Sequence, residues 1–188
     1  MVTTKQMGAG NQTGGQALFT QQQLKMKNNR LKPAPVIICD GVQTPDNFGS
    51  ILRVADAAGS NKVILLDCDI DLKSKKLSKI ARSTERHLSI GQCSLQQLRQ
   101  QQESATDRYT SLLALEITDQ STCLFETQLI NCDAVMLGHE STGISKQALA
   151  LCNQSIQIPM FGVNGSMNIS HALGIFLYEW RRQAHTAN

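Results

Sequence analysis

The sequence has 188 residues, of which 41% are hydrophobic and 18% charged, so it is long enough for one domain with a substantial core. No apolar run approaches the length that spans a bilayer, so we expect no membrane-spanning helix. Aromatic residues make up only 4% of the chain, and this argues against an aromatic platform for stacking single-stranded RNA.

The net charge of +3 is unevenly distributed. Residues 1–32 contain five basic and no acidic side chains, whereas the remaining residues contain 13 basic and 15 acidic side chains. A basic segment ahead of a near-neutral body indicates a polyanionic partner such as RNA, although a solvated flexible tail is the alternative. We therefore expect a basic, flexible extension over residues 1–32 and a folded domain over residues 33–188.

Six cysteines are scattered along the chain without a Cys-x-x-Cys pair or a nearby histidine cluster. This pattern argues against a zinc site and is typical of a reducing compartment. The first residues lack the apolar stretch of a signal peptide. We expect a cytoplasmic protein that holds no metal.

Short and nearly continuous apolar runs predict strands over residues 36–39, 63–66, 112–117, 134–137 and 156–158. Helical patterns fall between them, over residues 46–58, 75–83, 94–101, 145–152 and 169–182. The alternation predicts an α/β fold with a mostly parallel sheet flanked by helices. The last helix has a regular apolar stripe, which either packs on the sheet or meets a second subunit.

Three segments attract attention because polar residues follow predicted strands. The first, residues 40–53, leads into a helix with Asn47 in its first turn and Arg53 further along. A helix start and a guanidinium both suit a phosphate, although an ordinary first-turn amide and a solvated arginine are the alternative. Asn47 and Arg53 are six positions apart, about 120° around a helix, so they need not serve one site within one chain.

The second segment, residues 135–145, is a glycine-rich loop with a single acid, Glu140. Ligands of open α/β sheets bind beyond the carboxyl ends of strands, where this loop must lie. The third, residues 156–170, holds Ser166 and Asn168 just ahead of the last helix. Ordinary turns and helix caps explain each segment equally well when it is taken alone. His139 is the one histidine that we expect close to the chemistry.

Taken together, the three segments resemble, in order and spacing, the motifs of the SpoU/TrmH family of RNA 2′-O-ribose methyltransferases, which belongs to the SPOUT superfamily. The matching residues are Val42, Pro45, Asn47, Gly49, Ile51, Arg53, Ala55 and Gly59, then Gly138, Glu140, Gly143 and Ile144, then Ile158, Pro159, Met160, Gly162, Ser166, Met167, Asn168, Ile169 and Ser170. The resemblance covers about residues 36–183.

The resemblance implies a C-terminal trefoil knot, a homodimer and S-adenosylmethionine as cofactor. It implies cofactor contacts, largely through backbone groups, at Leu115, Gly138, Ile158, Met160 and Met167. It assigns activation of the ribose hydroxyl to Arg53, and we expect this guanidinium to clamp an RNA phosphate, since it stays charged in proteins. Asn47, Glu140, Ser166 and Asn168 are expected to shape the rest of the catalytic site.

Two other functions compete with RNA methylation. One is an idle RNA-binding protein that kept the fold, which predicts loss of Asn47, Arg53, Glu140 or Asn168; all four are present. The other is a nucleotide-binding oxidoreductase, which requires Gly-x-Gly-x-x-Gly after the first strand, where Val-Gln-Thr-Pro-Asp-Asn stands instead. Many relatives carry an accessory RNA-binding domain that we do not expect here, and this slightly favours transfer RNA over ribosomal RNA as the substrate.

Overall fold

A parallel β-sheet forms the centre of the computed structural model, which describes residues 32–186. Within these residues the sheet has seven strands in the order β3-β2-β1-β6-β4-β7-β5. Their bounds are β1 Val36–Asp40, β2 Lys62–Leu66, β3 Ser89–Cys93, β4 Leu112–Leu115, β5 Thr122–Cys123, β6 Ala134–Leu137 and β7 Gln154–Gln157. All pairings are parallel, as the alternation of strands and helices predicts. The predicted basic extension over residues 1–32 lies outside the described residues, apart from Lys32.

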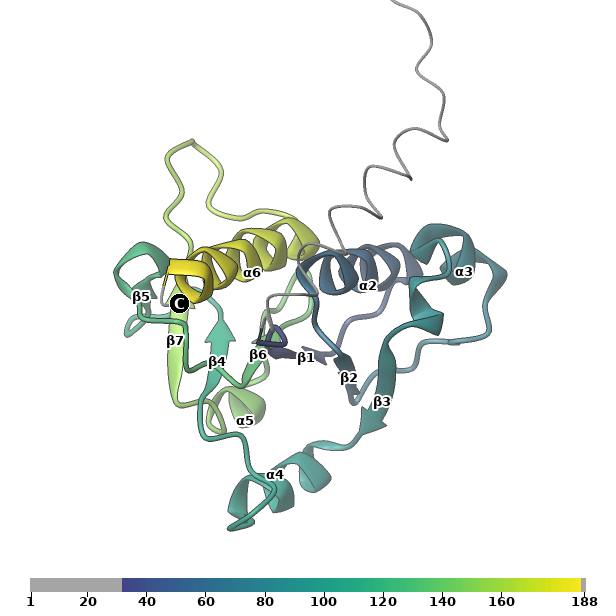
Figure 1. Cartoon of the computed structure of the whole chain (residues 1–188), viewed down its shortest axis with the longest axis horizontal. Helices are drawn as coiled ribbons and strands as arrows, with labels where there is room; N and C mark the ends of the chain where they lie inside the picture. Colours follow the sequence, from purple (N-terminus) through teal and green to yellow (C-terminus); the bar gives the residue numbers. More distant parts are fainter. Residues whose placement is uncertain (1–31, 187–188) are drawn as a thin grey trace, which may run out of the picture. The chain divides into compact units, whose positions relative to one another are not determined.

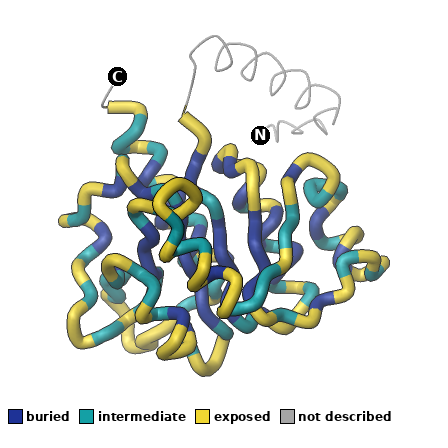
Figure 2. The backbone as a smooth tube through the Cα atoms, turned by 90° about the horizontal axis from the view of Figure 1, so that it is seen from below, coloured by how far each residue is buried: buried dark blue, intermediate teal, exposed yellow. Residues whose placement is uncertain are grey.

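Helices cover both faces of the sheet (Figure 1). They are α2 Pro45–Ala58, α3 Lys75–Ala81, α4 Leu95–Glu103, α5 Lys146–Leu149 and α6 Ile169–Thr186, with short 3-10 turns η1 Thr84–Arg86 and η2 Leu124–Glu126. α2, α3 and α6 pack on one face, and α4 and α5 contribute to a second apolar cluster on the other. Figure 2 shows buried segments in the interior with exposed loops around them. In the described residues, no helix is both long and apolar enough to cross a membrane.

Helix α2 begins and ends where its sequence predicts. Thr44 is the N-cap and its side chain accepts a hydrogen bond from the Asn47 backbone N–H, while Pro45 occupies the first turn. Gly59 ends the helix in the left-handed conformation with φ of 76°, which a glycine adopts without strain. The predicted apolar face is buried throughout, so α2 presents its other faces to the site and to solvent.

The apolar stripe of helix α6 packs within the chain, which is one of its two predicted alternatives. Leu173, Phe176, Leu177 and Trp180 are fully buried in the same cluster as the sheet and α2. The stripe therefore packs within one chain and does not require a second subunit for its burial. The Asn168 side chain accepts a hydrogen bond from the Ser170 N–H at 2.9 Å and so caps the first turn of α6.

Several predicted bounds were wrong. β3 and β5 were missed, because β3 is an edge strand of mixed polarity and β5 has only two residues. β4 ends at Leu115 rather than at residue 117, and α3 ends at Ala81 because Arg82 and Ser83 adopt positive φ values. α5 is a single turn, whereas α6 continues to Thr186. The six cysteines form no disulfide within residues 32–186.

Candidate functional site

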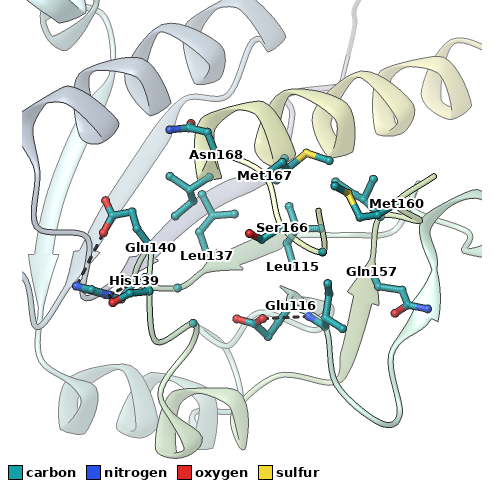
Figure 3. A pocket seen from close by; sticks show the side chains of 18 of the residues that line it. Leu115, Glu116, Leu137, His139, Glu140, Gln157, Met160, Ser166, Met167 and Asn168 are labelled. Atoms are coloured by element: carbon teal, nitrogen blue, oxygen red, sulfur yellow. Dashed lines mark hydrogen bonds and ion pairs between the residues drawn. The ribbon is translucent and has the colours of Figure 1, made fainter. Parts of the chain in front are cut away.

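A cavity of about 460 Å³ opens beyond the carboxyl ends of the central strands (Figure 3). Its walls come from the first turn of α2, the end of β4, the loop after β6 and the segment that joins β7 to α6. These four parts are far apart in the sequence and meet because parallel strands end at the same edge of a sheet. The size is within the range of small-molecule sites.

A chain of hydrogen bonds joins the three polar segments at this cavity. Asn47 Nδ2 donates to Glu140 Oε1 at 2.6 Å, and Asn168 Nδ2 donates to Asn47 Oδ1 at 2.9 Å. Asn168 Oδ1 in turn accepts from both the backbone N–H and the hydroxyl of Ser170. Both amides therefore use a donor and an acceptor at once, which fixes their orientation and holds the Glu140 carboxylate at the cavity wall.

The loop after β6 is shaped by two glycines and a carboxylate. His139 and Gly143 exchange backbone hydrogen bonds of 3.0 and 2.9 Å, and Gly143 has a φ of 70°. A Cβ at Gly138 would overlap the backbone of Gly143 and Ile144, so only glycine fits at that position. Glu116 Oε2 accepts the Ile144 N–H at 2.9 Å and ties this loop to the end of β4.

The His139 ring is held by the same loop. Its Nδ1 accepts a hydrogen bond from the Ser141 N–H at 3.0 Å, so the proton of the neutral ring lies on Nε2. That Nε2 is 3.9 Å from Glu140 Oε2. His139 therefore lies in the cavity wall, as the sequence indicates, whereas His87, His171 and His185 are exposed elsewhere.

The cavity lining combines apolar side chains with two acidic ones. The predicted cofactor residues all line it: Leu115, Gly138, Ile158, Met160 and Met167. Glu116 and Glu140 are its acidic residues, and none of the described residues that line it is Lys or Arg. Such a lining suits a ligand that combines an apolar body with positive charge, and it is poorly suited to a pyrophosphate.

The structure brings together four of the five predicted catalytic residues. Asn47, Glu140 and Asn168 are joined by hydrogen bonds, and Ser166 lines the cavity beside Asn168. Arg53 does not line the cavity; it is exposed on α2 and makes no hydrogen bond or ion pair with the described residues. Its position follows from helix geometry, since it lies about 120° around α2 from Asn47.

The cavity is also lined by three residues that the sequence does not predict, namely Glu116, Leu137 and Gln157. Glu116 follows directly on β4, and that position was the available signal, because side chains after parallel strands face the ligand edge. Cys39 lies on β1 near this edge, but burial raises the pKa of its thiol, so it stays protonated and is not a nucleophile. No group of metal-binding side chains occurs in residues 32–186.

Comparisons with known proteins fit this site. A sequence model of the SpoU rRNA Methylase family matches residues 34–178. The chain is 31% identical over 162 residues to the 23S rRNA (guanosine-2′-O-)-methyltransferase RlmB of Haemophilus ducreyi, covering 85% of this chain and 63% of that protein. It is 28% identical over 162 residues to the tRNA (guanosine(18)-2′-O)-methyltransferase of Escherichia coli K12, covering 84% of this chain and 67% of that protein.

Among solved structures, the TrmH/SpoU tRNA modifying enzyme of A. aeolicus matches with a TM-score of 0.72 and 22% identity, covering 90% of this chain and 86% of the other. This likeness shows the fold. The chain spans about 63% of the length of the RlmB relatives that it matches.

Proposed function

Because this chain belongs to the SpoU rRNA Methylase family, we propose that it transfers the methyl group of S-adenosylmethionine to a ribose 2′-hydroxyl of RNA. The observation that carries the proposal is the hydrogen-bond chain Glu140–Asn47–Asn168 at the wall of a cavity of about 460 Å³. An idle relative has no need to keep three residues from three separate segments in mutual hydrogen bonds. Their arrangement supports an enzyme rather than a binding protein that merely kept the fold.

The cavity fits S-adenosylmethionine by volume and by charge. Leu115, Ile158, Met160 and Met167 would contact its adenosine and methionine parts, and the backbone around Gly138 offers polar groups at close approach. Glu116 and Glu140 bring negative charge to the walls, which favours a sulfonium and an ammonium group. When bound, the cofactor supplies a methyl group on a positively charged sulfur.

A dinucleotide fits the same cavity poorly, because no lining side chain among the described residues is a lysine or arginine for its pyrophosphate. Isothermal titration is expected to show binding of S-adenosylmethionine and no binding of NAD. Binding of NAD alone would contradict the cofactor and favour an oxidoreductase.

The residues of the chain would mainly orient the reactants, namely the ribose hydroxyl and the methyl donor. The attacking hydroxyl must be in line with the methyl–sulfur bond, and such positioning supplies much of the rate of a displacement reaction. Asn47, Asn168 and Ser166 would orient the ribose at the cavity wall, beside a Glu140 carboxylate that Asn47 already holds. Arg53 would clamp an RNA phosphate and direct the hydroxyl, with a phosphate oxygen sharing its proton.

The position of Arg53 outside the cavity of its own chain supports a site that two subunits complete. Four large apolar side chains are also exposed on α6 and on the preceding loop, as expected for a surface that a second copy covers: Phe161, Val163, Ile175 and Tyr178. We infer a homodimer in which Arg53 of one subunit serves the cavity of the other. The knot expected for the segment between β6 and α6 belongs to the same proposal.

Mixed dimers test this arrangement directly. Arg53→Ala and Asn168→Ala are each expected to be inactive alone while S-adenosylmethionine binding persists in Arg53→Ala. If the two residues serve one site from different subunits, refolding the variants together restores about a quarter of the wild-type methyl transfer by random pairing. No recovery would place both residues in one chain's site, and near-normal turnover of Arg53→Ala would remove its assigned role.

We propose structured RNA as the substrate, with transfer RNA slightly favoured over ribosomal RNA. Relatives of both kinds match the same segment of this chain. Mapping 2′-O-methyl sites in a strain without this protein is expected to show the loss of a specific site in one of the two RNA classes.

A further inference from the structure

The basic residues of the folded body are concentrated in one segment. Residues 33–188 contain 13 basic and 15 acidic side chains. Six of the basic side chains and one of the acidic ones lie within residues 73–87. The rest of the body therefore has seven basic against fourteen acidic side chains. One segment of a body that is otherwise acidic is therefore strongly positive, and a surface of that kind attracts a polyanion.

The six cations lie in one short exposed segment, which comprises α3, η1 and the residues next to them. This α3 basic surface consists of Lys73, Lys75, Lys76, Lys79, Arg82 and Arg86, all of them exposed. Lys75, Lys79 and Arg82 are spaced four and three residues apart, which places them along one face of the helix, while Leu77 and Ala81 are buried on the other.

Most of these cations have no partner within residues 32–186. Lys76 forms an ion pair with Asp46, and the others make none. Glu85, the acidic residue of the segment, accepts a hydrogen bond from the Ser78 hydroxyl at 3.1 Å. The positive charge of the surface is therefore available to a ligand.

The α3 basic surface lies beside the helix that supplies Asn47 to the cavity (Figure 1). The Lys76–Asp46 ion pair joins α3 to the first turn of α2, and Gly49 allows close contact with Ile80, since a Cβ there would lie 2.7 Å from Ile80 Cγ2. Arg53 is seven positions after Asp46 and so within about 20° of the same side of α2. The exposed guanidinium of Arg53 thus lies on the α3 side of α2, and Asn47 on the cavity side.

We propose that the α3 basic surface holds the phosphodiester backbone of the substrate RNA beside the nucleotide that enters the cavity. This inference rests on the proposed function, in which RNA is the substrate. One helix diameter, about 10–12 Å, separates the surface from the cavity wall, so neighbouring phosphates of a bound RNA reach it. Unpaired lysines and arginines in a row suit phosphate contacts that position the RNA without reading its sequence.

An acidic protein partner is less suitable for this surface. Stable protein interfaces are built around large apolar or aromatic anchors. The exposed large apolar side chains of residues 32–186 lie elsewhere, at Ile117, Phe125, Phe161, Val163, Ile175 and Tyr178. The chemistry of the α3 basic surface therefore favours RNA.

A charge-matched pair of variants tests the surface. The test variant replaces Lys75, Lys79, Arg82 and Arg86 by Gln, and it spares Lys76 and Arg53. The control variant replaces four exposed cations elsewhere by Gln, namely Lys62, Arg99, Arg108 and Lys146. Both variants of the full chain lose the same charge. Unfolding midpoints and titration with S-adenosylmethionine show whether fold and cofactor binding stay as in the wild type.

RNA binding is then measured against salt concentration, with bulk transfer RNA and fragmented ribosomal RNA as separate probes. Loss of four phosphate contacts is expected to reduce the slope of log affinity against log salt by about three, and to weaken binding at least about tenfold near physiological salt. The control is expected to change the slope by less than about one. The KM for RNA should rise in the test variant, with kcat at saturating RNA retained.

Two results would overturn the inference while leaving RNA methylation intact: an unchanged slope in the test variant, or an equal loss in the control, which would indicate net charge rather than this surface. A wild-type chain that binds S-adenosylmethionine but neither binds nor methylates either RNA would instead contradict the proposed function, and the inference with it.

Discussion

Asn47 connects two partners by using both ends of its amide. The NH₂ group donates to Glu140 and the carbonyl oxygen accepts from Asn168, so the side chain bridges residues 93 positions and 121 positions away. An aspartate has the same shape but no donor. In contact with Glu140 it would place two carboxylates at hydrogen-bond distance, which disfavours ionisation of both.

For this reason Asn47→Asp is expected to reduce methyl transfer by at least about a hundredfold at pH 7, comparable with the removal of one preorganised donor from an active site. Raising the pH should reduce the residual activity further, because ionisation of the second carboxyl drives the pair apart. Asn47→Ala serves as the matched control, since it removes the same hydrogen bonds without adding charge. Methyl transfer measured from pH 6 to pH 9 distinguishes them, and identical pH profiles of the two variants would contradict the expected repulsion between the two carboxylates.

At the scale of elements, the local sequence was sufficient to predict a helix or strand that its own residues stabilise. α2 follows from Thr44, Pro45 and Gly59 together with its apolar face, and the central strands from their apolar runs. β3 was not predictable in this way, because an edge strand such as Ser89–Cys93 depends on its pairing with β2.

The site, too, was predictable only where it depends on local sequence. The three polar segments were predictable from their order and spacing, but their mutual hydrogen bonds depend on how the strands are arranged in the sheet. Glu116 was missed because a lone acid after a strand has no distinguishing pattern until the loop after β6 lies against it.

The loop after β6 depends on Gly138 for its shape, and this can be tested by substitution. Gly138→Ala puts a methyl group against the backbone of Gly143 and Ile144, so the loop must open and the hydrogen bond from Ile144 to Glu116 is strained. The affinity for S-adenosylmethionine is expected to fall at least about tenfold, equivalent to about 1.4 kcal/mol.

Gly174→Ala is the matched control. Its Cβ would lie 3.8 Å from Val54 Cγ1 in ordinary contact, and Ala in a helix interior is expected to stabilise the chain by up to about 1 kcal/mol. Titration calorimetry and urea unfolding measure both effects. Normal affinity in Gly138→Ala would show that the loop does not form the cofactor site.

At the scale of the whole molecule, ionisation of the partly buried Cys152 thiol opposes folding. Burial raises the pKa of Cys152 from 9.0 to about 12, with a smaller contribution from Asp40. Between these values the folded state keeps a proton that the unfolded state has lost. Stability is therefore retained below pH 9 and decreases as the pH rises from 9 toward 12.

The contribution of Cys152 is about 1.4 kcal/mol per pH unit in that window. Urea unfolding at pH 8 and pH 10 is expected to show a smaller loss of stability in Cys152→Ala than in the wild type. Equal losses in the two proteins would mean that this thiol ionises as readily in the folded state as in the unfolded one.

Residues 32–186 combine an apolar cavity that contains two acidic residues with a basic segment on a neighbouring helix, and we propose that ribose methylation of RNA uses both. The most direct test incubates the protein with S-adenosylmethionine labelled in its methyl group and with RNA, then digests the RNA to nucleosides. We predict label in 2′-O-methylnucleosides, in linkages that resist alkaline hydrolysis, and at least about a hundredfold less label with Asn47→Asp. Label on a base, or none in any RNA while the cofactor binds, would contradict this prediction.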